Sequence, residues 1–169
     1  KQPEQARIWK SGLMRIYRIE REKYLSTTLA GIGAAKTEGY RWNSLNTYLV
    51  YTAESRALAM LEVSVHLDLS NDLPTDRVYV EIEVPEEVIV MELPEEVLPE
   101  NWDSKPPALE TQYIGDDFVR QNESAVLRVP SAIVPQEYNY LINPNHPDSE
   151  KIKVVSVHRV AFDSRFKKD

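Results

Sequence analysis

The clearest pattern in the chain is a strict alternation of apolar and polar side chains over residues 77–84. The apolar positions of this pattern are Val78, Val80, Ile82 and Val84. A period of two is typical of a β-strand with one face packed against a core and the other face in water. We therefore predict a strand at 77–84, and a second strand at 88–93 that pairs with it across the turn at 85–87.

Shorter apolar runs rich in β-branched and aromatic residues predict the other strands. These runs cover residues 15–19, 48–52, 125–129, 138–142 and 152–162. A short helix is predicted at 115–122. The Gly-x-Gly at 31–33 is predicted to be a plain loop, because it lacks the third glycine of a phosphate-binding turn. Several strands and one central helix indicate an α+β domain with mixed or antiparallel sheets rather than regular βαβ alternation.

The central helix is predicted over residues 53–67, with Thr52 as its N-cap. The apolar positions at helical spacing are Leu58, Leu61 and Val65. At ~100° per residue, Glu62 lies about 40° from Leu58, at the border of this apolar stripe. A carboxylate in that place must be ion-paired, hydrogen-bonded or directed into a cleft, because burying it alone is costly. The residues alone leave a structural ion pair and a functional role equally open.

Composition and length narrow the class of protein. The 169 residues are enough for one domain with a proper core. Cysteine is absent and the three histidines are scattered, so neither a disulfide framework nor a metal site is predicted. No segment reaches the ~20 apolar residues of a membrane span, and we expect a cytoplasmic protein. Residues 1–13 are predicted to be an arm or a cloning remnant, 14–165 the domain, and 166–169 a tail.

The net charge of −7 argues against a broad phosphate-binding surface for DNA or RNA. An anionic small ligand is compatible with this charge, because one or two well-placed arginines can bind a pyrophosphate. Eight glutamates and no lysine or arginine lie between Val78 and Ser104. Such a stretch is usually a solvated face, although it could contact a basic partner.

Five short motifs occur in order along the chain. They are Gly-Tyr-Arg-Trp-Asn at 39–43, Val-Tyr-Thr-Ala-Glu-Ser at 50–55, Met-Leu-Glu-Val at 60–63, Val-Pro-Ser-Ala at 129–132, and Asn-Tyr-Leu-Ile-Asn-Pro-x-His-Pro at 139–147. With these motifs, over roughly residues 14–162, the chain resembles the RES-domain family, which is named for an arginine, a glutamate and a serine. The resemblance implies a fold like that of the ADP-ribosyltransferases.

The resemblance also implies a function. Members of the family are typically toxins of type II toxin–antitoxin pairs that deplete NAD, and an Xre-type antitoxin with a helix-turn-helix region neutralises them. We therefore expect NAD as a substrate rather than a cofactor, and a hetero-oligomer with an antitoxin. No metal, no membrane and no direct binding of nucleic acid are expected.

Carried over residue by residue, the namesake residues are Arg41, Glu62 and Ser131, which the resemblance implies are catalytic. Arg18, Arg41 and Tyr51 are the residues that it implies for binding NAD. The chain departs from the usual family pattern at Tyr40, where a glycine is more common, and at Leu45, where a proline is more common. Both departures alter the loop beside Arg41 and remove no functional group.

These residue types suit cleavage of the nicotinamide–ribose bond. The reaction passes through an oxocarbenium-like cation, which a carboxylate such as Glu62 can stabilise, and Glu62 can also orient an attacking water. The planar fork of an arginine binds two pyrophosphate oxygens at once. Tyr51 would stack on the nicotinamide ring, and Ser131 would hold the amide or a ribose hydroxyl.

Each of these residues also has a plain structural explanation. Tyr51 can be a core aromatic and Arg41 an ion-paired or solvated arginine. The prolines at 130 and 135 place Ser131 at a strand edge or an exposed corner. No nucleophile elbow surrounds Ser131. His146 lies between two prolines and is predicted to be a loop residue rather than an acid or base.

Three functions are therefore open at this point. The first is hydrolysis of NAD. The second is transfer of ADP-ribose to a protein target, or to phosphate. The third is a non-catalytic interaction domain that uses the acidic stretch at 81–100.

Overall fold

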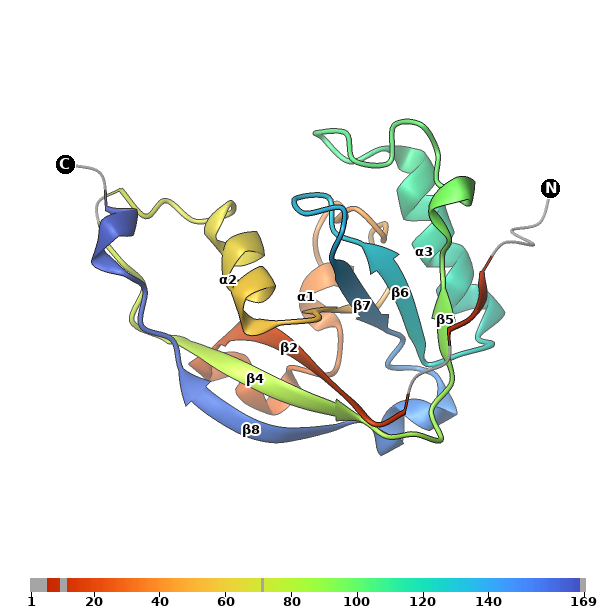
Figure 1. Cartoon of the computed structure of the whole chain (residues 1–169), viewed down its shortest axis with the longest axis horizontal. Coiled ribbons are helices and arrows are strands. Elements are labelled where there is room, and N and C mark those ends of the chain that lie inside the picture. The colour runs from red at the N-terminus through yellow and green to blue at the C-terminus, as the bar shows by residue number, and fades with distance from the viewer. Residues whose placement is uncertain (1–5, 10–11, 71, 168–169) are drawn as a thin grey trace.

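The computed structural model describes residues 6–9, 12–70 and 72–167. Through these residues runs one curled sheet of eight strands in the order β1-β5-β6-β7-β3-β2-β4-β8 (Figure 1). The strands are β1 Arg7–Trp9, β2 Met14–Arg21, β3 Val50–Ala53, β4 Arg77–Val84, β5 Val90–Glu92, β6 Val126–Pro130, β7 Tyr138–Ile142 and β8 Lys153–Arg159. The pair β5–β6 is parallel and the other pairs are antiparallel, so the α+β prediction is confirmed.

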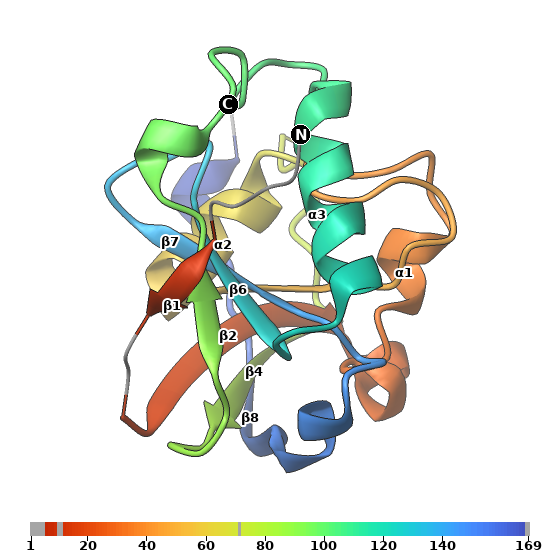
Figure 2. The ribbon, with the colours of Figure 1, turned by 90° about the vertical axis from the view of Figure 1, so that its right-hand side faces the viewer.

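Three α-helices lie beside the sheet in the described residues: α1 Ile32–Ala35, α2 Arg56–Ser64 and α3 Leu109–Gln121. Short 3₁₀ helices complete this part of the chain: Glu22–Thr27, Glu95–Val97, Pro147–Lys151 and Ser164–Phe166. Helix α3 packs on β5 and β6, and α2 packs on β2 and β3 in the middle of the sheet (Figures 1 and 2). The two helices therefore cover different parts of the sheet.

The strand predicted at 77–84 is β4 with the same bounds, and its apolar positions are buried as predicted. β4 pairs with β2 over the whole length of both strands, which places Ile16 opposite Ile82. Both side chains are almost fully buried in the main hydrophobic cluster. Burying side chains of this size stabilises a fold by roughly 1.5–3 kcal/mol each, so the cluster fixes the position of β2.

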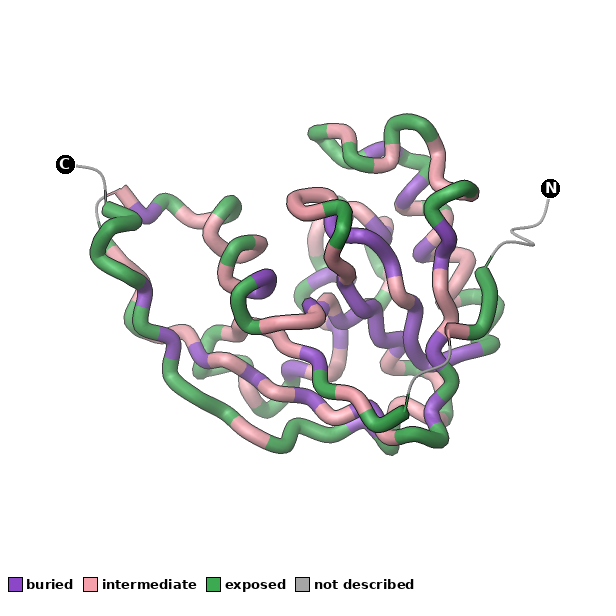
Figure 3. The backbone as a smooth tube through the Cα atoms, viewed as in Figure 1, coloured by how far each residue is buried: buried purple, intermediate pink, exposed green. Residues whose placement is uncertain are grey.

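β2 and β3 are joined by one register pair, Tyr17 with Ala53, in the described residues. On one side of this pair lie β4 and β8, and on the other side lie β7, β6, β5 and β1. The buried residues are concentrated in β6 and β7, whereas the edge strand β8 is mostly exposed (Figure 3). The sheet thus consists of two halves that meet at β2 and β3.

The prediction that residues 88–93 pair with β4 is wrong. The strand in this region, β5, pairs with β1 and β6 instead. A period-two pattern reports which face of a strand is buried and does not report its partner. The strand predicted at 152–162 is also too long, because β8 ends at Arg159 and the next residues leave the sheet to pack on Leu69.

The central helix begins later than predicted. Thr52 is a residue of β3 whose hydroxyl donates to the Tyr140 carbonyl oxygen at 2.8 Å. Ser55 is the N-cap instead, and its Oγ accepts from the Leu58 amide at 3.0 Å. Leu61 is 40% exposed and Val65 is 56% exposed, so the predicted apolar stripe is wrong beyond Leu58.

Two further helices differ from the predictions. The region predicted as a plain loop contains the four-residue helix α1, which begins after Gly31 at a φ of 69°. The helix predicted at 115–122 is α3, which begins at Leu109. Its buried positions include Thr111 and Gly115, and the absence of an apolar stripe there explains why the first turns were not predicted.

The N-terminal segment contributes an edge strand. Arg7 and Trp9 belong to β1, and Arg7 forms an ion pair with Glu92 of β5 at 3.0 Å. Trp9 contacts the Arg128 guanidinium, which lies 4.6 Å from its ring centroid. Residues 1–5, 10–11 and 168–169 of the predicted arm and tail lie outside the described residues.

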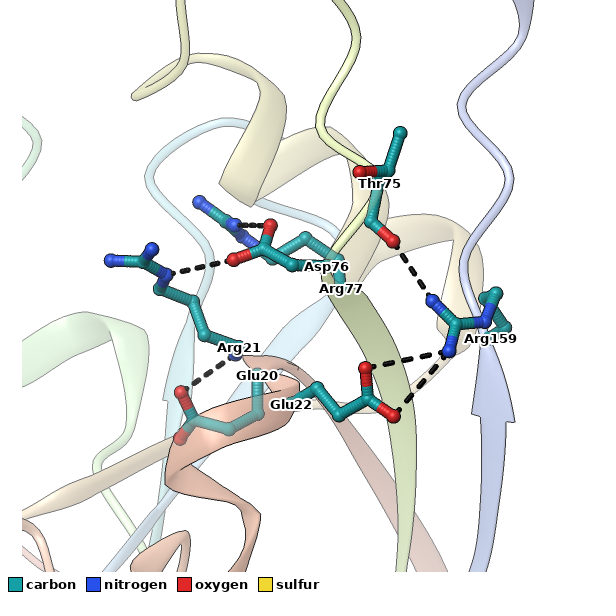
Figure 4. Close-up of polar contacts among 7 residues, drawn as sticks. All are labelled: Glu20, Arg21, Glu22, Thr75, Asp76, Arg77 and Arg159. Carbon is teal, nitrogen blue, oxygen red and sulfur yellow. Dashed lines mark hydrogen bonds and ion pairs between the residues drawn. The ribbon is translucent and has the colours of Figure 1, made fainter.

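Arginines pair with several glutamates of the acidic stretch. Arg15 lies 2.6 Å from Glu83, and Arg56 lies 3.0 Å from Glu81. Another network joins β2, the segment before β4, and β8 (Figure 4). There Asp76 binds Arg21 and Arg77, while Arg159 donates to Glu22 and to the Thr75 carbonyl oxygen. Exposed pairs of this kind contribute about 0–1 kcal/mol each, so they define the ends of the strands more than they stabilise the fold.

Within the described ranges, no helix combines the length and the apolar composition that crossing a membrane requires. The same residues contain no group of three or more His, Asp or Glu side chains arranged to hold a metal ion.

Candidate active site

Glu62 on α2 accepts hydrogen bonds from two side chains that belong to the last two of the five sequence motifs. The Ser131 hydroxyl donates to its Oε1 at 2.8 Å, and the Asn139 amide donates to its Oε2 at 2.7 Å. The structure therefore brings together two of the three predicted catalytic residues. It adds Asn139, which the sequence analysis did not select. A polar residue inside the apolar run of β7, at the first position of the last motif, was the available signal.

Ser131 directly follows β6 and is completely buried, so the prediction of an exposed corner is wrong. Its backbone amide donates to the Glu137 carbonyl oxygen at 2.9 Å. Its Oγ accepts from the amides of Ile133 and Val134 at 3.1 and 3.2 Å. The tight turn after Pro130 folds back over the hydroxyl and covers it.

Asn139 on β7 is buried and faces β3. Besides Glu62, its Nδ2 donates to the Thr52 carbonyl oxygen at 3.1 Å. The amide thus joins the helix that carries the carboxylate to the strand that precedes this helix. One side chain of β7 thus contacts both β3 and α2.

The environment of Glu62 opposes its negative charge. Burial raises the pKa of its carboxyl, and the nearby Glu137 adds to this rise, while the hydrogen bonds from Ser131 and Asn139 lower the pKa. Burial is the largest of these causes. Glu54 shows the same behaviour, since burial and Glu137 raise the pKa of its carboxyl. A half-buried carboxylate in such surroundings is typical of functional sites.

Arg18 on β2 lies on the other side of β3. It donates to Glu20 at 2.9 Å, and its Nη1 lies 3.5 Å from the Tyr51 carbonyl oxygen. Its Nε is buried without a hydrogen-bond partner among the described residues. Burial lowers the pKa of this guanidinium, and Glu20 opposes the shift. Successive carbonyl groups of β3 thus contact Arg18 and Asn139, which places the arginine and the Glu62 site on the two sides of one strand.

Tyr51 is packed and hydrogen-bonded inside the protein. Its hydroxyl donates to Asn43 Oδ1 at 2.6 Å and accepts from the Trp42 amide at 3.1 Å. Burial raises the pKa of this hydroxyl. Tyr40, one of the two departures from the family pattern, packs edge-on against the Tyr51 ring at 5.5 Å. The tyrosine therefore fixes the loop that carries Arg41.

Arg41 binds the loop that precedes α3, and among the described residues it forms no hydrogen bond to Glu62 or Ser131. Its Nη1 donates to the carbonyl oxygens of Trp102 and Ser104 at 2.7 and 3.0 Å. Burial lowers the pKa of this guanidinium. His146 has a structural contact as well, since its Nδ1 accepts from the Asp148 amide at 3.0 Å and caps a 3₁₀ helix.

Comparison with known proteins identifies the family. The family model of the RES domain matches residues 15–164. Over 147 residues the chain is 44% identical to the Prs ADP-ribosylating toxin of Sphingobium sp. (strain YBL2), covering 84% of this chain and 88% of that protein. Over 155 residues it is 37% identical to Toxin Res of Yersinia enterocolitica, covering 91% of this chain and 100% of that protein.

A solved structure shares the fold. It is the crystal structure of the M. tuberculosis MbcT–MbcA toxin–antitoxin complex, with a TM-score of 0.70 at 16% sequence identity. The match covers 92% of this chain and 86% of that chain. The family model, the identity to the Sphingobium and Yersinia proteins and the shared fold agree, and this chain belongs to the RES domain family.

Proposed function

We propose that this chain is the toxin of a toxin–antitoxin pair and that it depletes NAD by cleaving the nicotinamide–ribose bond. The observation that carries the proposal is the half-buried Glu62 carboxylate, held by Ser131 and Asn139 rather than by an arginine. A structural ion pair would have supplied an arginine partner at this position. The names of the Sphingobium and Yersinia relatives support the role of a toxin.

In the proposed reaction, the bond between ribose C1′ and the nicotinamide nitrogen breaks, and nicotinamide leaves as a neutral base. The positive charge that develops on the ribose is stabilised by the Glu62 carboxylate. Water then attacks C1′ and loses a proton, which gives ADP-ribose. The half-buried Arg18, whose side chain is 23% exposed, supplies guanidinium donors for a pyrophosphate oxygen.

We further propose that an antitoxin of the Xre type, with a helix-turn-helix region, binds this chain. The solved structure that shares the fold is a toxin–antitoxin complex, which supports a partner of this class. Coexpression of this chain with a candidate antitoxin should give a complex that releases no nicotinamide. Free chain that causes no growth arrest, although it is active in vitro, would contradict the role of a toxin.

The direct test is incubation of the purified chain with NAD and measurement of released nicotinamide. Glu62→Gln should lower turnover about 10²–10³-fold, because it removes the charge that faces the transition state while retaining the shape of the side chain. Glu86→Gln, at an exposed turn, is the control and should keep the turnover of the unmodified chain. The proposal is wrong if the folded, antitoxin-free chain releases no nicotinamide.

Transfer of ADP-ribose to a protein is the second candidate. It is favoured by the relative that is 44% identical, which is named an ADP-ribosylating toxin. The bond that breaks is the same, and a protein side chain takes the place of water as the nucleophile. Covalent label on a protein after incubation with adenine-labelled NAD would identify this acceptor, and turnover that requires added phosphate would identify phosphorolysis instead.

A further inference from the structure

We propose that Ser131 and Asn139 are positioning residues that act through Glu62: they hold its carboxylate ionised and in one orientation, and they do not themselves contact the substrate. This inference rests on the proposed role of Glu62 in cleaving NAD. It assigns to the namesake serine a different role from the substrate contact that the family resemblance implies.

The hydroxyl of Ser131 has no capacity left for a substrate. A serine hydroxyl has one proton to donate and two lone pairs that accept. The amides of Ile133 and Val134 take the two lone pairs, so the proton must go to another acceptor. Glu62 Oε1 at 2.8 Å is that acceptor. Because the residue is 0% exposed, water cannot replace any of these partners.

The amide of Asn139 is fixed as a donor in the same way. Its Nδ2 contacts two oxygens, the Thr52 carbonyl and Glu62 Oε2. A carbonyl oxygen can only accept, so a flipped amide would place two acceptors against each other. The nitrogen therefore faces Glu62, and the residue is 9% exposed, which limits its movement.

Two fixed donors favour the ionised carboxylate. Hydrogen bonds to the charged form stabilise it, and a proton on either oxygen of Glu62 would weaken the bond that this oxygen accepts. Burial and Glu137, the charged group that faces the carboxyl, favour the protonated form instead. Each carboxylate oxygen can accept more than one hydrogen bond, so both keep a position for a ribose hydroxyl or for the ribose cation. We call the two donors, Ser131 and Asn139, the clamp. The clamp keeps the Glu62 carboxylate charged and oriented in a site that would otherwise favour the neutral acid.

The test is the dependence of nicotinamide release on pH. In Asn139→Asp, the new carboxylate repels Glu62 and cannot donate when ionised. The acid limb of the profile should move upward by about one pH unit or more, and activity should be partly recovered at higher pH. In Ser131→Ala the limb should move in the same direction, because one donor to Glu62 is removed. A loss of stability alone would lower the whole profile without moving its limb.

Two matched variants serve as controls. Ser124 is a buried serine at the other end of β6, whose Oγ also accepts a backbone amide, that of Val126, at 3.1 Å. Asn143 is a buried asparagine just beyond β7 that donates to Asn122 Oδ1 at 2.9 Å. Ser124→Ala and Asn143→Asp make the same chemical changes away from Glu62, and they should leave the acid limb in place.

The outcomes separate the positioning role from the proposed function. If the unmodified chain releases nicotinamide and neither clamp variant moves the limb relative to its control, the positioning role is overturned and the proposed function stands. If the unmodified chain releases none, the proposed function is overturned. The clamp is then tested by a ¹³C NMR titration of the Glu62 carboxyl, which Glu62→Gln identifies. In Ser131→Ala this titration must also shift upward, and an unchanged titration rejects the clamp.

Discussion

Arg18 has a half-buried side chain whose guanidinium donors are only partly matched inside the protein. Glu20 accepts one hydrogen bond at 2.9 Å, while Nε has no partner among the described residues. A buried donor without an acceptor costs about 1–3 kcal/mol. The Arg18 side chain is nevertheless 23% exposed, whereas Arg41 Nη1 already donates to two backbone carbonyl oxygens. Arg18 is therefore the better supported of the two arginines proposed to bind pyrophosphate.

At the residue scale, Arg18→Lys should raise the KM for NAD about tenfold or more with a smaller change in kcat. Lysine keeps the charge but lacks the planar fork that binds two oxygens. Steady-state kinetics of nicotinamide release measure both parameters. Arg15→Lys is the matched control, because Arg15 lies on the same strand and pairs with Glu83. Equal effects of the two variants on KM would contradict a direct contact between Arg18 and NAD.

The helix α3 positions the Arg41 loop through small and polar side chains. Asp116 accepts from the Ser44 amide at 2.9 Å, and Gln112 donates to the Tyr40 carbonyl oxygen at 3.0 Å. Gly115 lies against the Trp42 carbonyl group, where an added Cβ would overlap the oxygen. Figure 2 shows α3 beside the segment that joins α1 to β3. The close approach of the helix therefore depends on a glycine at this position.

At the element scale, Gly115→Ala should lower the free energy of unfolding by about 1–3 kcal/mol, because the helix or the loop must move. The displaced Arg41 loop should also reduce nicotinamide release. Gly33→Ala is the matched control in α1, where no atom lies near the new methyl group. It should be neutral or stabilising by up to about 1 kcal/mol. Denaturant unfolding measures both changes, and similar values for the two variants would reject the packing argument.

At the scale of the whole molecule, two half-buried carboxyl groups, Glu54 in the β3–α2 connection and Glu62 on α2, lie where the protein disfavours their negative charge. Burial raises the pKa of both Glu54 and Glu62 above the ordinary value of 4.5. Since the unfolded chain keeps the ordinary value, the folded state is favoured by these two groups at low pH. Their contribution falls as the pH rises from about 4.5 through the raised folded values. Asp163, at the surface, has the opposite sign, because Arg165 lowers its pKa to about 2.

At this scale, Glu54→Gln should raise the Tm at pH 7 and leave it unchanged near pH 4. Glutamine removes a charge that the folded state disfavours, and at pH 4 the glutamate is already largely protonated. Thermal unfolding between pH 4 and pH 8 measures the difference. Glu123→Gln, at an exposed position after α3, should show no such dependence on pH. A Tm for Glu54→Gln that is below that of the unmodified chain at pH 7 would reverse the assigned sign.

The chain's own pattern predicts the parts of the fold that depend on local burial. β4 and β7 occur where apolar runs predict them, because the packed side chains belong to the strands themselves. The partner of β5 and the first turns of α3 were not predictable from these patterns. They depend on contacts with β6 and with Trp42, which lie far away in the sequence.

The candidate site shows the same division. Helical spacing identifies Glu62 as a carboxylate at the border of an apolar face. Its two hydrogen-bond donors lie 69 and 77 positions later in the sequence, so the spacing could not predict them. The burial of Ser131 follows from the turn after Pro130, which the bracketing prolines do not reveal. The family motifs predicted Ser131 as a site residue, whereas the role of Asn139 became visible only from its contact with Glu62 in the structure.

The single register pair between β2 and β3 divides the site as well as the sheet. Arg18 belongs to β2, whereas Glu62, Ser131 and Asn139 are attached to β3 and the strands beyond it. The two halves nevertheless share one hydrophobic cluster, which contains Ile16 and Val80 on one side of this pair and Val50, Val126 and Ile142 on the other. The distance between the arginine and the carboxylate is therefore set by side-chain packing across this junction more than by the hydrogen bonds of the sheet.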